Sequence, residues 1–414
     1  MTMGGMRFMP WTHLLIVVAV AGCGPRPLSL DEIGEGYVRA ALGLAQHDPA
    51  LVDDWRGPQA WRPGPRSPVA GLRDTIAGLR RELERTSPAP RDRARRDYLG
   101  AQLRALHFAA RRLLGDAASI DEQAREEFGV AYGTTDAATI AAIHGSLAVA
   151  LPGTGSIAER FAALKRRTLV PDAQRLSVMK AALVACRQAT VSAAAFLPSE
   201  GAPAERVTVT ITPGLGWDGS ARYLGSGHTT IEINGDGPLD LSRALRLACH
   251  EGYPGHHVQY LLIERIGWPE LGLSPGFGPH LLYTEGAAEA GAELAFSRED
   301  REQIYRDLLA PAAELPPTDA HTLAIVDDLL IGLQPVVTDV ARAYLAGSLP
   351  RVHAGERLRS EALVLNADAM LTMIERRRAR ALVYAEGRRL ILRQMEQPQL
   401  PALGTLFSHA LALQ

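Results

Sequence analysis

The chain carries little net charge, almost no lysine and few cysteines. Its 44 Lys and Arg residues nearly balance 46 Asp and Glu residues, which gives a formal net charge of −2. Such a balance gives no bias toward a polyanion, so we expect no nucleic-acid partner. Lys165 and Lys180 are the only lysines, and GC-rich codon use accounts for this preference for arginine.

The three cysteines are Cys23, Cys186 and Cys249. We expect Cys186 and Cys249 to be buried as small apolar residues, because a sequence alone does not identify a disulfide. A disulfide between them is the alternative. Cys249 beside His250 is also a candidate metal ligand, but a weaker one than the residues described below.

Long hydrophobic runs are missing except near the N-terminus. Arg7 precedes the apolar residues 14–20, which lead into the sequence Val-Ala-Gly-Cys ending at Cys23. This order is typical of a secretory signal, and the run is too short for a stable membrane span. Because it ends on cysteine, the segment resembles a bacterial lipobox.

We therefore predict a lipoprotein signal peptide over residues 1–22, lipidation of Cys23 and a tether over residues 23–30. A plain signal peptide and an uncleaved anchor are the alternatives. The predicted location is the cell envelope: a lipid anchor would hold the protein on a bacterial membrane, facing the periplasm or the outside.

The rest of the chain predicts a mainly α, multi-helical fold. It has 414 residues, 47% of them hydrophobic, enough for one large domain or two. Helical spacing of apolar residues dominates, whereas residues 207–212 and 229–234 alternate with period two and predict strands. We expect a small antiparallel β element just before the helix that carries Cys249. Residues 31–200 would form an N-terminal helical region, packed as one domain with residues 201–414.

Residues 249–259, Cys-His-Glu-Gly-Tyr-Pro-Gly-His-His-Val-Gln, hold the strongest functional signal. His250 followed by Glu251 is the start of a zinc-peptidase signature, in which the imidazole holds the metal and the carboxylate activates water. The usual second ligand lies four residues after the first, but Pro254 stands there. His256 and His257 are the remaining candidates, and neither fits an unbroken helix.

Pro254 and Gly255 offer a way out of this mismatch. Proline removes a helical hydrogen bond and glycine relaxes the backbone, so we expect a kink or bulge at this point. Such a distortion can bring either His256 or His257 toward His250. The sequence does not decide which of them binds metal and which contacts a ligand or the substrate.

A third ligand is expected from the row Glu285, Glu289 and Glu293. These residues recur every four positions, which places their carboxylates on one helix face. A buried row of carboxylates needs a cation as partner. Taken alone, the row fits a solvated acidic face, but the upstream His-Glu pair favours a metal site.

The segments 248–259 and 284–289 resemble the bacterial family called domain of unknown function 885. Its members are helical and are regarded as candidate zinc metallopeptidases, distantly similar to gluzincins. The hallmark His-Glu-x-x-Pro-Gly-His-His matches residues 250–257, and the hallmark Glu-Gly matches residues 285–286. Ala287 stands where members usually have Trp. Weaker matches at 47–49 and 384–389 extend the resemblance over roughly residues 31–395.

The resemblance implies a metallopeptidase-like fold and a role for each matching residue. Zn²⁺ would be bound by His250, Glu285 and one of His256 and His257. Glu251 would act as general base and then as proton donor to the leaving amine. Glu289 would orient a ligand imidazole.

A pair on a predicted C-terminal helix completes the expected site. Tyr384 could stabilise the oxyanion, and Arg388 could hold a substrate carboxylate. Ordinary helix packing is the equal alternative for this pair. The strand 229–234 could pair with an extended peptide, or it could only brace the motif helix.

The leading hypothesis is a lipid-anchored zinc metallopeptidase that cleaves peptides in the cell envelope. One alternative is a non-catalytic lipoprotein that binds metal or peptide on a decayed peptidase fold, since the chain is shorter than typical family members and lacks the Trp. Another is a zinc amidase or esterase, because the same activation of water serves any acyl bond.

Overall fold

The computed structural model describes residues 26–193 and 205–395. The predicted signal peptide and the lipidation site Cys23 therefore lie outside the described residues. Over the described ranges the fold is mainly α, as predicted. None of the helices in those ranges is both long and apolar enough to cross a membrane.

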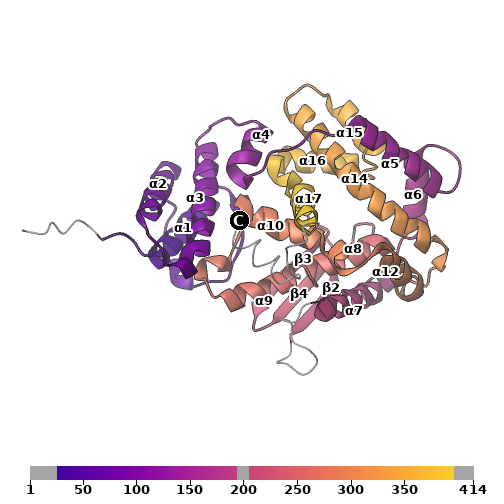
Figure 1. Ribbon diagram of the computed structural model, residues 1–414, viewed down its shortest axis with the longest axis horizontal. Helices are drawn as coiled ribbons and strands as arrows, with labels where there is room; N and C mark the ends of the chain where they lie inside the picture. Colours follow the sequence, from indigo (N-terminus) through magenta and orange to yellow (C-terminus); the bar gives the residue numbers. More distant parts are fainter. Residues whose placement is uncertain (1–25, 194–204, 396–414) are drawn as a thin grey trace, which may run out of the picture.

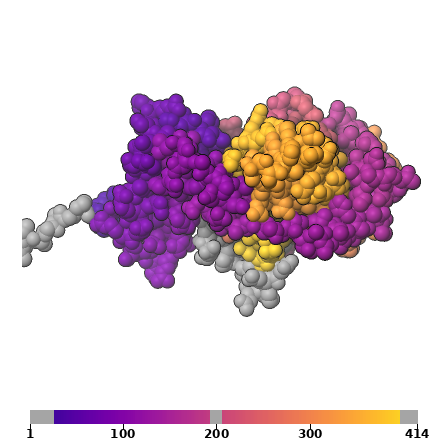
Figure 2. Space-filling model, turned by 90° about the horizontal axis from the view of Figure 1, so that it is seen from above, coloured from indigo at the N-terminus to yellow at the C-terminus, as the bar shows by residue number. Residues whose placement is uncertain are grey.

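The N-terminal helices form a lobe at one end of the molecule (Figures 1 and 2). They are α1 (Leu30–Ala45), α2 (Val69–Arg85) and α3 (Arg93–Leu113). Ser29 and Glu32 form a capping box that fixes the start of α1. A short strand in this lobe, β1 (Val52–Trp55), pairs antiparallel with β5 (Leu273–Pro275) from much later in the chain.

The lobe has its own apolar core, which includes Tyr37, Leu99 and Leu103. Leu271, Leu273 and Phe277 belong to the same core. Residues 271–277 are thus anchored on the N-terminal helices.

The next helices, α4 (Ile120–Gln123), α5 (Ala137–Ala150), α6 (Ile157–Arg167) and α7 (Arg175–Ala193), cross to the other side of the molecule. Residues from this segment and from the later part of the chain share the largest apolar core. Leu164 and Val178 lie in that core together with Ile231, Leu245 and Leu323. Side chains from both predicted regions therefore share this core.

The β element before the motif helix is larger than predicted. It has three strands in the order β2-β4-β3: β2 (Arg206–Thr212), β3 (Gly219–Gly225) and β4 (His228–Asn234). The pair β3/β4 is antiparallel, but β2 and β4, the two predicted strands, are parallel. β3 was missed because its sequence looks like part of a Gly-rich loop. Since β4 is paired on both sides, an extended peptide cannot add to it.

The rest of the described chain is helical. Two helices carry the motif, α8 (Leu241–Glu251) and α9 (His256–Ile266), and the acidic row lies on α10 (Gly278–Glu289) and α11 (Gly291–Ala295). The later helices are α12 (Arg298–Gln303), α13 (Ala310–Ala312), α14 (Ala320–Leu345), α15 (Arg351–Ser360), α16 (Ala367–Arg377) and α17 (Val383–Met395). α10 and α17 pack closely against each other at the centre of the molecule (Figure 1).

Candidate metal centre

The motif lies on two helices joined by a tight turn. α8 begins after Asp240, whose carboxylate caps the helix and is held by Lys165 Nζ at 2.9 Å. α8 ends at Glu251, and α9 begins at His256. The distortion expected at Pro254 is therefore a complete break between helices, larger than a kink.

Glycine makes this turn possible. The Gly255 amide donates to the Cys249 carbonyl at 3.0 Å. A Cβ on Gly255 would lie 1.8 Å from the carbonyl oxygen of His250, closer than atoms can approach. The first residue of α9 is thereby folded back against the last turn of α8.

This turn brings three candidate ligands together: His250, His256 and Glu285. Oε2 of Glu285 lies 3.4 Å from His250 Nε2 and 3.6 Å from His256 Nε2. Two ligand atoms bound to one tetrahedral zinc ion at about 2.0–2.1 Å are separated by roughly 3.3 Å. The spacing of these atoms therefore fits a single zinc ion.

The other ring nitrogen of each histidine has its own partner. His250 Nδ1 lies 3.2 Å from Oε2 of Glu289. His256 Nδ1 lies 2.9 Å from Oε1 of Gln259, and the Gln259 amide donates to the Thr284 carbonyl at 2.8 Å. Donation from each Nδ1 leaves each Nε2 with a free lone pair, the arrangement found for histidines that bind metal.

His257 points away from this group. Its side chain is fully buried, its Nδ1 lies 2.7 Å from the Thr229 hydroxyl, and its Nε2 lies 3.6 Å from Oε2 of Glu205. Of the two histidines left open by the sequence, the geometry brings His256 to the candidate ligands. His257 instead connects the first turn of α9 to strand β4.

Glu251 is buried beside strand β3. Only 3% of the residue is exposed. A Cβ on Gly219 would lie 3.1 Å from its Oε1, so the glycine makes room for the carboxylate. Oε2 of Glu251 has no hydrogen-bond partner among the described residues. A buried polar atom without a partner is costly and marks a place where a ligand or water can bind.

The charges at the centre favour a cation. Burial lowers the pKa of His250, but the adjacent Glu285 and Glu289 outweigh it and raise that pKa to about 10. Burial raises the pKa of both carboxyls. Nevertheless, His256 and His250 hold the pKa of Glu285 well below its usual range, and His250 holds the pKa of Glu289 at about 2. Protons and metal ions compete for the same imidazole lone pairs.

Each carboxylate of the acidic row faces an imidazole or an arginine, so the row does not form a solvated face. Glu289 and Glu293 both approach Arg246, at 3.8 and 3.5 Å. Glu293 also lies 2.5 Å from Nη2 of Arg388. Arg388 is 1% exposed, and burial lowers its pKa. Its guanidinium is therefore directed to Glu293 and not to open solvent.

Tyr384 lies against the candidate ligands. Its ring stacks on His250, with centroids 6.5 Å apart and 24° between the ring planes. The negative charge of Glu285 and burial both raise the pKa of Tyr384. The phenol therefore keeps its proton and can donate a hydrogen bond, while its role toward an oxyanion stays a prediction.

The comparisons with known proteins concern the fold. No family model and no curated protein matches the chain. A crystal structure described as that of "the putative lipoprotein from Colwellia psychrerythraea" covers 93% of this chain and 72% of that chain, with 18% identity and a TM-score of 0.50. A "putative lipoprotein of unknown function" from Shewanella oneidensis covers 83% of this chain and 69% of that chain, with 12% identity and a TM-score of 0.46. The first likeness shows a shared fold.

Cys186 and Cys249 form a disulfide, with their Cα atoms 5.5 Å apart. Both are fully buried, so the expected burial is confirmed, but the expectation of two separate apolar residues is wrong. The bond connects α7 to α8 one residue before His250. Since Cys249 is bonded to sulfur, it is not available as a metal ligand.

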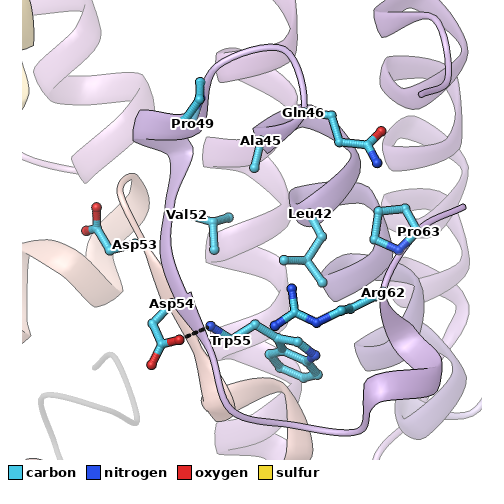
Figure 3. A pocket seen from close by; sticks show the side chains of 10 residues that line it. All are labelled: Leu42, Ala45, Gln46, Pro49, Val52, Asp53, Asp54, Trp55, Arg62 and Pro63. Atoms are coloured by element: carbon cyan, nitrogen blue, oxygen red, sulfur yellow. Dashed lines mark hydrogen bonds between the residues drawn. The ribbon is translucent and has the colours of Figure 1, made fainter. Parts of the chain in front are cut away.

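None of the candidate ligands lines the pocket of about 410 Å³ in the N-terminal lobe. It lies between α1 and strand β1, with Leu42 facing Val52 and Trp55 (Figure 3). Asp53 points to the opposite side of the strand. There it accepts a hydrogen bond from Nη2 of Arg380 at 2.6 Å, and burial raises its pKa.

Sequence reasoning missed Gln259 and Tyr260, which both contact His256. Gln259 forms a hydrogen bond with the His256 ring, and the Tyr260 ring stacks on the His256 ring with centroids 6.4 Å apart. Residues three and four positions later on a helix share a face. The spacing from His256 could therefore have identified both, once α9 was known to begin there.

Proposed function

We propose that this protein is a zinc-dependent hydrolase, a metallopeptidase that acts on peptides in the bacterial cell envelope and is held to a membrane by lipid at Cys23. The observation that carries the proposal is the convergence of His250, His256 and Glu285, with Glu251 next in sequence to His250 and its buried Oε2 without a partner among the described residues. Two imidazoles and one carboxylate are the donor set typical of catalytic zinc sites that keep a position open.

Zinc, when bound, lowers the pKa of water and polarises a substrate carbonyl. Glu251 can accept a proton from the attacking water and return it to the leaving amine, since it directly follows His250 and its Oε2 has no hydrogen-bond partner among the described residues. Tyr384 can donate a hydrogen bond to the carbonyl oxygen as negative charge develops there.

The charged chain behind the ligands has a positioning role in this proposal. Arg388 pairs with Glu293, and Arg246 lies near both Glu293 and Glu289. Glu289 in turn accepts a hydrogen bond from Nδ1 of His250. Such partners fix the orientation of a ligand ring. We therefore assign Arg388 to the support of His250 and no longer to the binding of a substrate carboxylate.

The lipid anchor rests on the lipobox that ends at Cys23. The Colwellia psychrerythraea protein that shares the fold is itself described as a "putative lipoprotein", which supports the same assignment for this chain. Peptide is the proposed substrate because Glu251 can protonate an amine leaving group.

Zinc content tests the metal site. The purified wild-type protein should bind one zinc ion per chain by mass spectrometry of metals, and His250→Ala, His256→Ala and Glu285→Ala should each lose it. His353→Ala, a change of an exposed histidine on α15, is the matched control and should keep the ion. A wild-type protein without zinc, or full zinc in His250→Ala, would refute the assignment.

A peptide library tests catalysis. Glu251→Gln should keep its zinc but cleave peptides at least about 100-fold more slowly, because a general base contributes roughly 10²–10⁴-fold to rate. Equal turnover by this variant would exclude Glu251 as the base. Turnover of esters or amides in the absence of any peptide cleavage would favour the amidase or esterase alternative.

A further inference from the structure

A second pocket, of about 340 Å³, begins one helical turn beyond His256 and has no part in the reaction above. Its walls come from α9, from the end of β3 and from the segments around β1 and β5. The residues that matter here are Arg56, Tyr223, Leu224, Tyr260, Ile263 and Trp268.

Two elements lead from the metal centre to this pocket. On α9, His256, Tyr260 and Ile263 share a face, and seven residues of helix span about 10 Å. On β3, Gly219 lies against Glu251, and the strand reaches the pocket at Leu224, roughly 16 Å further on. The pocket is therefore within the reach of a peptide bound at the candidate ligands.

The charged groups of the pocket are already paired. Arg56 donates to Asp54 at 3.0 Å and to Ser274 at 2.9 Å. Its guanidinium also lies 4.6 Å from the centre of the Tyr260 ring. Glu264 accepts hydrogen bonds from the Tyr223 hydroxyl and from the Ser226 amide. The groups left for an occupant are apolar and aromatic.

The apolar groups lie at the rim and are partly uncovered. Leu224 is 61% exposed although it is a large hydrophobic residue. The rings of Tyr223 and Tyr260 stack with centroids 5.3 Å apart. The Tyr260 hydroxyl donates to the Ala221 carbonyl at 3.1 Å, so the backbone of β3 is already bonded there. Recognition at this place therefore depends on side chains.

We propose that this pocket is a substrate subsite for an aromatic or branched apolar side chain. An extended peptide rises about 3.3 Å per residue, so 10–16 Å places that side chain about three to five residues from the cleaved bond. This inference rests on the proposed function and adds to it a preference for extended peptides with a distal hydrophobic residue.

Peptide binding tests the subsite without reference to catalysis. The probes are labelled octapeptides of Ala and Ser with Trp, Leu, Ala or Glu placed at each position in turn, and the readout is fluorescence anisotropy with the zinc-loaded Glu251→Gln protein. At one position, Trp and Leu peptides should bind at least about tenfold more tightly than Ala and Glu peptides. Adding Leu224→Asp should remove this preference.

Leu365→Asp is the matched control. Leu365 is 54% exposed and lies between α15 and α16, so this change should leave the preference intact. Equal binding of all four peptides at every position, or equal loss in both leucine variants, would overturn the subsite. Both side chains are exposed, so circular dichroism melting should show the same folded state.

Cleavage separates the subsite from the hydrolase proposal. In the Glu251-containing protein, Leu224→Asp should raise KM for octapeptides with the preferred residue and leave cleavage of peptides too short to reach the pocket unchanged. Preferential binding without any cleavage would refute the hydrolase proposal and leave the subsite proposal standing. Cleavage without a distal preference would refute the subsite and leave the hydrolase.

Discussion

Gly286 of α10 lies directly against Gly387 of α17. A Cβ on Gly286 would sit 2.3 Å from the carbonyl carbon of Gly387, and a Cβ on Gly387 would sit 2.3 Å from the Leu282 carbonyl oxygen. The two helices therefore touch backbone to backbone. This close approach brings Tyr384 on α17 beside His250, which lies next to Glu285 on α10.

Gly286→Ala should therefore destabilise the protein and weaken zinc binding. Overpacking typically costs about 1–3 kcal/mol, and here the obstacle is backbone that cannot turn aside. Urea denaturation and zinc titration measure the two effects. Gly145→Ala is the control, since it lies on α5 with open space around its Cβ position. A similar free energy of unfolding for both variants would contradict the close contact.

The partners of the two ligand imidazoles should tune zinc affinity. Glu289→Gln and Gln259→Leu should each weaken zinc binding by about 10–100-fold, because such partners orient the ligand ring. Competition with a chelator of known affinity measures this change. Glu299→Gln, a change of an exposed carboxylate, should have no effect, and unchanged affinity in Glu289→Gln would remove Glu289 from the site.

His280 should make stability depend on pH. It is 5% exposed, and its Nδ1 lies 3.0 Å from the Tyr98 hydroxyl. Burial, with a smaller effect of Arg56, lowers the pKa of His280 to about 4. The unfolded chain, with a pKa of about 6.5, binds the proton first as pH falls. The stabilisation is therefore complete above about pH 6.5 and is lost toward pH 4, by on the order of 3 kcal/mol.

The measurement is urea denaturation of the wild type and His280→Gln between pH 4 and 7.5. The variant should show a smaller slope of unfolding free energy against pH between about 4 and 6.5. His353→Gln should keep the wild-type slope. Parallel curves for wild type and His280→Gln would show that His280 does not titrate in this way.

The disulfide should stabilise both the fold and the site. Cys186 and Cys249 are 63 residues apart in sequence, and closing a loop of that size stabilises by about 4 kcal/mol in the chain-entropy account. The double variant Cys186→Ala, Cys249→Ala should lose stability of that order and bind zinc more weakly. An unchanged zinc affinity would show that the bond braces the core alone.

Local patterns predicted the parts of the fold that depend on local sequence. The helical spacing that dominates the chain and the period-two alternation in residues 207–212 and 229–234 correspond to observed elements. Strand β3 was missed because a glycine at each end and Arg222 interrupt its pattern. Whether strands pair in parallel depends on connections that no local pattern contains, as for β2 and β4.

The choice between His256 and His257 has the same origin. Both follow the same Pro-Gly pair, and only the angle between α8 and α9 decides which ring meets His250. That angle depends on the close contact of Gly255 with the His250 carbonyl. The disulfide likewise depends on how α7 packs on α8. The sequence limited the second imidazole to two candidates, and these long-range contacts determine which of them lies beside His250 and Glu285.

The bond between Cys186 and Cys249 also makes the candidate metal centre depend on the compartment in which the chain folds. Disulfides persist in oxidising compartments and are rare where thiols are kept reduced. A newly made chain in the cytosol would carry His250 next to a free thiol, with α7 and α8 not yet joined. In the envelope proposed here, oxidation would complete the brace, so the mature site would form only after export.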